Sequence, residues 1–217
     1  MLDEGQSVHQ AAERLQVAPS TAIRWRHRFL RLAQQAKSAL LSGIAEANET
    51  FLLRSAKGQL VSGRAPRHRG GHASARGTCD DHVPALVVRD RLGGCADFIP
   101  GRSSKRKILA ALAPVLAPDA VLCIDGSSAM AGAACVMGIE HPAPNMTTGS
   151  RVRGAWHIQN ANVYHARLKG WMRRFRGIAI SYLHHDLGGL RAVERCAPAP
   201  LPATQRLNLS LGRFAHP

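Results

Sequence analysis

The sequence predicts an α/β fold in which a mixed sheet flanked by helices is preceded by an all-α module. Three observations lead to this expectation. Residues 7–30 carry apolar side chains at helical spacing. After residue 43, strand-like segments come first and then alternate with helical ones. One of these segments, DAVLCIDGSS (119–128), contains a continuously apolar run, which is typical of a strand in the middle of a sheet.

The first 40 residues are expected to form a helix-turn-helix. In SVHQAAERLQVAPSTAIRWRHRFL (7–30), residues 16–19 interrupt the helical pattern, and Ser20 stands where an N-cap belongs. The second helix is expected to pack through Ile23, Trp25, Phe29 and Leu30, and a further helix is expected in RLAQQAKSALL (31–41).

The second helix of a helix-turn-helix enters the major groove of DNA. The candidate DNA contacts on this helix are its polar and basic residues, Ser20, Thr21, Arg24, Arg26, His27 and Arg28. The alternative is a helical hairpin that only packs against its neighbour.

The core is expected over residues 43–190, starting with a strand in GIAEANETFLL (43–53). A hairpin follows in HVPALVVRDRLGG (82–94) and CADFIP (95–100), with its turn at 92–94. Further along, helices are expected in 103–117, opened by Ser103 or Ser104, in 128–138 and in 161–175, with a short strand near 138–141. Three antiparallel strands followed by alternating helices and strands predict a mixed sheet.

Two segments lack such periodicity. Residues 55–78 are rich in Gly, Ser, Arg and His, and form either a mobile basic loop that tracks phosphates, through residues such as Arg67 and Arg69, or a disordered linker. Residues 191–217 are rich in Pro and Ala and are expected to be a poorly ordered tail.

The charge limits the possible partners. The 217 residues include 29 Lys and Arg against 14 Asp and Glu, a net charge of +15. Such an excess repels itself unless an anion is bound, and the phosphate backbone of a nucleic acid is the commonest partner. No run of about eighteen apolar residues predicts a membrane span. The polar start MLDEGQSVHQ is no secretory signal, and five scattered cysteines without a CxxC pair suit a reducing cytoplasm.

Asp125 is the first candidate for chemistry, because it ends an apolar strand and ligands gather beyond the carboxyl ends of strands. An Asp-Gly turn that starts the next helix is an equally good interpretation of the same residues. On the helix at 161–175, Asn162, His165 and Lys169 share a polar face, opposite an apolar stripe at 164, 168, 171 and 175. If that stripe lies against the sheet, Asn162 points away from Asp125 unless it takes an N-cap conformation.

The segment HIQNANVYHARLKGWMRRFRGIA (157–179) closely resembles the C-terminal motif of DDE-type insertion-sequence transposases of the ISXO-two-like branch, the IS fifteen-ninety-five family. The resemblance extends, in the right order, to AAERLQVAPSTAIRWRHRFL, GIAEANETFLLRSAKG, RGGHASARGT, VPALVVRDRLG and DAVLCIDG. It covers roughly residues 7 to 190.

The resemblance implies an RNase H-like transposase core behind a DNA-binding helix-turn-helix. It assigns catalytic positions to Asn48, Asp125, Asn162 and Lys169, the first three of them around Mg²⁺ or Mn²⁺. In such enzymes the metal positions a DNA end for attack by water and then by a 3′-hydroxyl. It also implies double-stranded DNA as partner, both transposon ends and target, and a homo-oligomer on that DNA. Arg173 and Arg174 extend the basic surface of the helix.

The first family carboxylate is absent, because the Asp-Glu-Thr motif reads Asn48-Glu49-Thr50. An amide in place of a carboxylate removes one negative charge from a site that must bind two dications, and Mg²⁺ prefers charged oxygens. Glu49 is expected on the other face of the strand, and Glu46 lies about 7 Å away along it. We therefore expect strand cleavage and transfer to be impaired in this copy.

Two other clusters are expected to carry no chemistry. In CDDH (79–82) the residues should alternate across the start of a strand and fail to converge, and HHD (184–186) should lie in a turn.

Two other functions remain open. The first is an inactive DNA-binding protein or repressor of transposition, and the second, a ribosomal or RNA-packaging protein, suits the charge but not the predicted elements.

Overall fold

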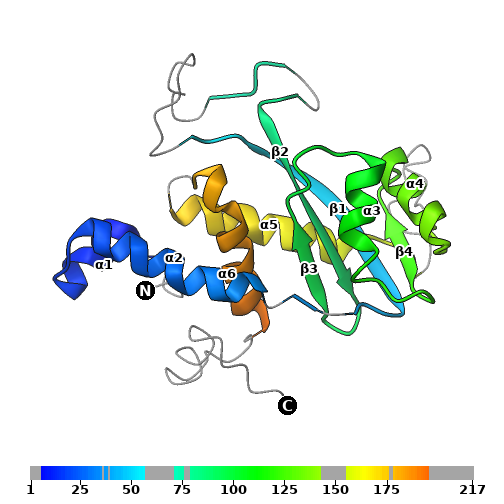
Figure 1. Ribbon diagram of the computed structural model, residues 1–217, viewed down its shortest axis with the longest axis horizontal. Helices are drawn as coiled ribbons and strands as arrows, with labels where there is room; N and C mark the ends of the chain where they lie inside the picture. Colours follow the sequence, from blue (N-terminus) through cyan, green and yellow to red (C-terminus); the bar gives the residue numbers. More distant parts are fainter. Residues whose placement is uncertain are drawn as a thin grey trace. The chain divides into compact units, whose positions relative to one another are not determined.

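The computed structural model describes residues 6–35, 37–38, 40–56, 71–75, 79–142, 155–175 and 178–195 (Figure 1). By contacts the chain divides into two compact units. One draws on Met1–Lys37, Ser55–Gly63 and Arg167–Pro217, and the other on Ser38–Arg54 and Arg64–Ala166. The predicted boundaries followed sequence order, whereas this division joins the N-terminal helices to the C-terminal ones.

The helical unit begins with α1 (Val8–Leu15) and α2 (Pro19–Gln35). A capping box opens α1, since the hydroxyl of Ser7 accepts from the backbone N–H of Gln10 and the Gln10 side chain accepts from that of Ser7. The expected N-cap at Ser20 is wrong, because α2 starts at Pro19 and Ser20 lies within the helix. Proline suits that first position because its missing N–H would have no partner within the helix. The separate helix expected from residue 31 is also wrong, because α2 continues to Gln35.

The helical unit also contains the end of α5 (Gln159–Arg174), the 3₁₀ turn η2 (Ile180–Tyr182) and α6 (Leu183–Arg195). The sequence indicated a turn at 184–186 and a poorly ordered tail over 191–217, but 184–186 and 191–195 are helical, and 196–217 lie outside the described residues. The reason is packing between α2 and α6, where Gly188 touches the backbone of Gln34 and Gly189 touches Leu30. These two glycines weaken the helical signal of the sequence, yet they allow the two helices to approach closely.

The second unit is built on a four-stranded sheet in the order β3-β2-β1-β4. The first three strands, β1 (Ile44–Leu53), β2 (His82–Asp90) and β3 (Cys95–Phe98), pair antiparallel, and β4 (Val121–Ile124) runs parallel to β1. Together with α3 (Lys105–Leu112) and α4 (Ser128–Met137), these strands confirm the predicted class, a mixed RNase H-like sheet behind an all-α helix pair. The short strand expected near 138–141 is a single bridge between Val121 and Glu140.

The two faces of the sheet carry different chemistry. One face packs on α3 and α4 in an apolar core that includes Ala45, Leu86, Ile108, Leu122 and Met130. The other face carries Glu46 and Asn48 of β1, whose side chains bond to the first turns of α5. Because alternate residues of a strand point to opposite faces, β1 supplies side chains both to the core and to a polar site. None of the helices within the described residues is long and apolar enough to cross a membrane.

We predict that Gly188→Ala destabilises the helical unit. A Cβ at this position would lie 2.5 Å from backbone atoms of Gln34, which cannot move aside as a side chain can. Overpacking of this kind costs about 1–3 kcal/mol. The matched control is Gly170→Ala on α5, where a Cβ meets nothing within 4 Å and where alanine should add up to about 1 kcal/mol of helix stability. Urea unfolding of the two variants should therefore shift in opposite directions, and a stabilised Gly188→Ala protein would contradict this packing.

Candidate functional site

The pairing of β1 with β4 brings two of the predicted catalytic positions together. Ala47 pairs with Ile124 at the end of the parallel ladder, so Asn48 and Asp125 are the next residues on neighbouring strands. By alternation from Glu46, the side chain of Asn48 belongs to the face of the sheet opposite α3 and α4, and Asp125 follows directly after the end of β4. The third predicted position, Asn162, reaches this face from α5.

Asp125 is half-buried, and one of its carboxylate oxygens accepts a hydrogen bond of 3.1 Å from the backbone N–H of Ser127, the residue before α4. Between them Gly126 adopts a φ of 86°, a conformation that glycine permits without strain. The turn predicted for Asp-Gly is therefore formed, and Asp125 also lies beside Asn48.

Asn48 and Asn162 are joined by a hydrogen bond of 2.7 Å from Nδ2 of Asn48 to Oδ1 of Asn162. The backbone N–H of Glu49 donates to Oδ1 of Asn48 at 2.7 Å, and because that donor is unambiguous it fixes the orientation of the Asn48 amide. The oxygen of Asn48 thus accepts from the backbone and its nitrogen faces Asn162. The Asn48 amide therefore has a protein partner on both its oxygen and its nitrogen, at the position where the family motif has a carboxylate.

The conflict expected between Asn162 and the apolar stripe of α5 does not arise. Asn162 lies within the regular helix, since its N–H donates to the carbonyl of Ile158, and no N-cap conformation is needed. Tyr164 reaches the same face of the sheet and donates to Asp97 at 2.6 Å. Lys169, the fourth predicted catalytic residue, is exposed and follows Asn162 by seven residues, in the part of α5 that belongs to the other unit. His165, which lies between these two residues in the sequence, is buried.

Glu46 is a residue whose role the sequence did not indicate. Its fully buried carboxylate accepts from the backbone N–H of Asn160 at 2.7 Å, from the Asn160 side chain at 2.9 Å and from the N–H of Ala161 at 3.4 Å. The ring of His157 and the guanidinium of Arg91 lie at 3.2 and 3.7 Å. A carboxylate at a helix N-terminus is favourable, so Glu46 fastens α5 to β1. Both of its oxygens have partners in this arrangement.

Glu49 accepts a hydrogen bond from the hydroxyl of Ser103, which precedes α3. Burial raises the pKa of the Glu49 carboxyl, and the negative charge of Asp125 raises it further, while the Ser103 hydrogen bond acts in the opposite direction. A carboxyl whose neutral form is favoured in this way is a poor replacement for the absent acid at position 48.

These donors do not fit two divalent cations. Two-metal chemistry requires several charged oxygens around a pair of ions about 3.5–4 Å apart. At positions 48, 125 and 162 there is one carboxylate and two amides, and the amides are bonded to each other. Across the described parts of the chain, no group of three or more His, Cys, Asp or Glu is placed to hold a metal.

On α2, the predicted DNA contacts fall on different faces. Ser20, Arg24 and Arg28 are exposed and recur every four residues, so they form one ridge, and Arg31 extends it. Thr21 is half-buried at its edge. The opposite ridge is buried and consists of Ala22, Arg26 and Leu30. The expectation that Ile23 and Trp25 would be core residues is wrong, because they are 41% and 42% exposed.

Arg26 is therefore not an available DNA contact. Its guanidinium donates to Asp186 of α6 at 2.6 Å and lies 3.6 Å from the centre of the Phe175 ring, and its side chain is 7% exposed. Asp186 is also bonded to the indole N–H of Trp171 at 3.1 Å. Burial raises the pKa of Asp186 and the Arg26 charge opposes that rise, which is the balance expected of a buried ion pair.

His27 is likewise engaged within the helical unit. Its ring stacks on Tyr182 with centroids 3.9 Å apart, and its Nδ1 lies 3.3 Å from Nδ1 of His185. Of the remaining predicted contacts, Arg173 and Arg174 are exposed in the last turn of α5, and Arg67 and Arg69 lie outside the described residues.

The expectation for CDDH (79–82) is also wrong. Residues 80 and 81 form a turn, closed by a hydrogen bond from the N–H of His82 to the carbonyl of Cys79. This turn brings Sγ of Cys79 within 3.4 Å of Nδ1 of His82, so the two side chains do converge.

Parts of the chain are similar to known proteins. A homeodomain-like domain family matches residues 1–36. Among solved structures, the simian T-cell lymphotropic virus intasome aligns with 80% of this chain at 12% identity and a TM-score of 0.40, and the chain spans 56% of its counterpart. A pre-cleavage Mos1 transpososome aligns with 89% of this chain and 73% of its counterpart, at 12% identity and a TM-score of 0.31. The Mos1 mariner paired end complex with Mn has the same coverage, at 13% identity and a TM-score of 0.27. No curated protein matches the chain.

We predict that Arg26 stabilises the fold and Arg24 binds DNA. Arg26→Met should lower the free energy of unfolding by about 3–5 kcal/mol, because it leaves Asp186 buried without its cationic partner. The matched change Arg24→Met, at an exposed position, should alter stability by less than about 0.5 kcal/mol and weaken duplex DNA binding. Denaturant unfolding and fluorescence anisotropy separate the two effects, and a stable Arg26→Met protein with impaired binding would contradict the assignment.

We predict that the helical unit loses stability as the pH falls from 6.5 towards 4. Burial, with the charges of His184, His27 and Arg31, lowers the pKa of His185 to about 4. Between these pH values His185 is protonated in the unfolded chain but not in the folded chain. The free energy of unfolding therefore decreases as the pH falls. His185→Asn should flatten the dependence, whereas His9→Asn at an exposed position of α1 should retain it. Equal pH dependence of unfolding in both variants would contradict the prediction.

Proposed function

We propose that this chain is a DNA-binding protein of the insertion-sequence transposase type, of the ISXO-two-like branch, in which strand cleavage and transfer at transposon ends are impaired. The observation that carries the proposal is the hydrogen bond between Asn48 and Asn162, at 2.7 Å, beside Asp125. A family motif quoted above expects a carboxylate at position 48. In this chain an amide occupies the position and is satisfied without a metal.

The expected loss of activity follows from charge. Mg²⁺ or Mn²⁺, when bound by such a core, supplies stabilisation of the negative charge that develops on the attacked phosphate. Asp125 is the one carboxylate among the three positions, Glu46 is committed to α5, and the pKa of Glu49 is raised. The remaining charge is too small to bring two dications together against their mutual repulsion.

DNA binding does not depend on those carboxylates. The exposed ridge of Ser20, Arg24 and Arg28 on α2 has the arrangement with which a helix-turn-helix contacts bases and phosphates. The homeodomain-like match over residues 1–36 covers that ridge, and the net charge of +15 favours a polyanion. We propose double-stranded DNA as the partner, bound by a homo-oligomer.

A second candidate function is a repressor that binds transposon ends without any latent catalysis. The hydrogen bonds of Asn48 favour it, because both the oxygen and the nitrogen of this amide already have protein partners.

Restoring the acid distinguishes the two functions. Asn48→Asp should gain Mg²⁺-dependent nicking of a plasmid that carries the coding region with its native flanking DNA. The gain should be at least about 10–100-fold, the range seen even for groups that only support metal ligands. Asn48→Ala and the double change Asn48→Asp/Asp125→Asn are the controls and should remain inactive.

The outcomes are separable. Wild-type protein that cleaves as fast as Asn48→Asp would refute impairment. An Asn48→Asp protein that binds DNA normally but gains no cleavage would favour the repressor.

A further inference from the structure

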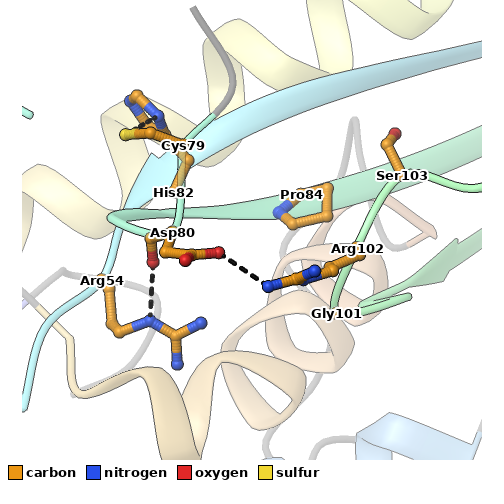
Figure 2. A pocket seen from close by; sticks show the side chains of 8 residues that line it. All are labelled: Arg54, Cys79, Asp80, His82, Pro84, Gly101, Arg102 and Ser103. Atoms are coloured by element: carbon orange, nitrogen blue, oxygen red, sulfur yellow. Dashed lines mark hydrogen bonds and ion pairs between the residues drawn. The ribbon is translucent and has the colours of Figure 1, made fainter. Parts of the chain in front are cut away.

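A polar pocket of about 240 Å³ opens in the sheet unit, beside the last residues of β1 and the first residues of β2 (Figure 2). It is lined by the turn that carries Asp80 and by the segment that leads into α3. The lining residues are Arg54, Cys79, Asp80, His82, Pro84, Gly101, Arg102 and Ser103, and we call this the Asp80 pocket.

Two arginines are arranged around Asp80. Nε of Arg54 donates to the backbone carbonyl of Asp80 at 3.2 Å, and the guanidinium of Arg102 lies 3.0 Å from its carboxylate, as Figure 2 shows. The side chains of Arg102 and Asp80 are 79% and 91% exposed. Ion pairs so exposed contribute little to stability, so the arrangement is not explained by a need to hold the fold together.

A third cation adjoins the pocket. Gly101 has a φ of 78°, and Nζ of Lys107 lies 3.2 Å from the place where a Cβ would be. Three cationic groups therefore lie in or beside the pocket, and one of them, Arg102, is paired with the carboxylate of Asp80. A second carboxylate, Glu49, reaches the pocket only through its bond to Ser103, and burial raises its pKa. The site is electropositive overall.

We propose that the Asp80 pocket binds a backbone phosphate of duplex DNA, which gives the core a DNA contact of its own in addition to α2. A guanidinium presents paired N–H donors that match the oxygens of a phosphate, and Arg54 and Arg102 offer two of them. The inference rests on the proposed function, since it names the part of the core that meets the DNA.

The position of the pocket along β1 suits a continuous duplex. Arg54 follows Asn48 by six residues, and strand geometry makes that about 20 Å. Phosphates of one DNA strand recur about every 3.4 Å along the helix axis. A 30-base-pair duplex, about 100 Å long, is therefore long enough to extend from Asn48 to Arg54.

The first test measures how DNA binding by the full chain depends on salt. The probe is a fluorescein-labelled 30-base-pair duplex of random sequence, titrated by anisotropy between 50 and 200 mM KCl, a range of about fourfold in salt. Arg54→Gln/Arg102→Gln should weaken binding and reduce the slope of log K against log salt by about 1, the value for one lost phosphate contact. The matched control Lys105→Gln/Arg106→Gln removes the same charge from exposed positions of α3 that do not line the pocket.

The control variants distinguish a failure of the pocket proposal from a failure of the proposed function. An unchanged slope in Arg54→Gln/Arg102→Gln, or an equal reduction in the control, would contradict phosphate binding in the Asp80 pocket. Wild-type protein that does not bind the duplex would overturn the proposed function as well. If only Arg24→Gln/Arg28→Gln lost binding, the proposed function would stand and phosphate binding in the Asp80 pocket would be contradicted.

The second test uses the pocket's own thiol. Cys79 is half-buried in the pocket, whereas Cys135 is exposed on α4 outside it. The same duplex should slow maleimide labelling of Cys79, followed by peptide mass spectrometry, and leave Cys135 unaffected. Asp80→Asn, which removes the carboxylate that competes with phosphate, should tighten binding severalfold. A rate of Cys79 labelling that is the same with and without the duplex, or weaker DNA binding by Asp80→Asn, would contradict the proposal.

Discussion

The parallel pairing of β1 with β4 decides what the candidate site can contain. Its register ends at Ala47 and Ile124, and so places Asn48 and Asp125 next to each other although 77 positions of chain separate them. The buried carboxylate of Glu46 then fastens the first turn of α5 two residues away on the same strand face. With the strand and the helix held in this way, Asn162 lies within hydrogen-bond distance of Asn48.

The consequence is electrostatic. A carboxylate at position 48 would stand beside that of Asp125, and the two would repel each other unless a cation lay between them. The amide removes this repulsion and supplies an N–H donor to Asn162. The site is thus stable without a metal, and the change that relieves the fold of a charge conflict is the same change that removes a metal ligand. In the proposed function DNA binding is spared, because the residues that we assign to it lie on α2 and around the Asp80 pocket.

The sequence predicted most of the sheet and part of the site. Strands β1, β2 and β4 were predictable because their apolar runs and turn residues are local signals, and the resemblance aligned positions 48, 125 and 162. Arg26 was misassigned because an arginine in a basic helix gives no local sign of a partner 160 residues away. The helix α6 was missed because Gly188 and Gly189 lower its helical propensity, and the compensating contact with α2 is tertiary. Cys79 and His82 converge through a turn that their residue types alone do not indicate.

The most direct measurement is a titration of the wild-type protein with Mn²⁺, followed by electron paramagnetic resonance of the free ion. The account predicts that millimolar Mn²⁺ stays free in the presence of the protein, and that Asp125→Asn changes nothing, because one carboxylate beside a closed amide pair does not retain the ion. One or two Mn²⁺ bound per chain, released by Asp125→Asn, would contradict it.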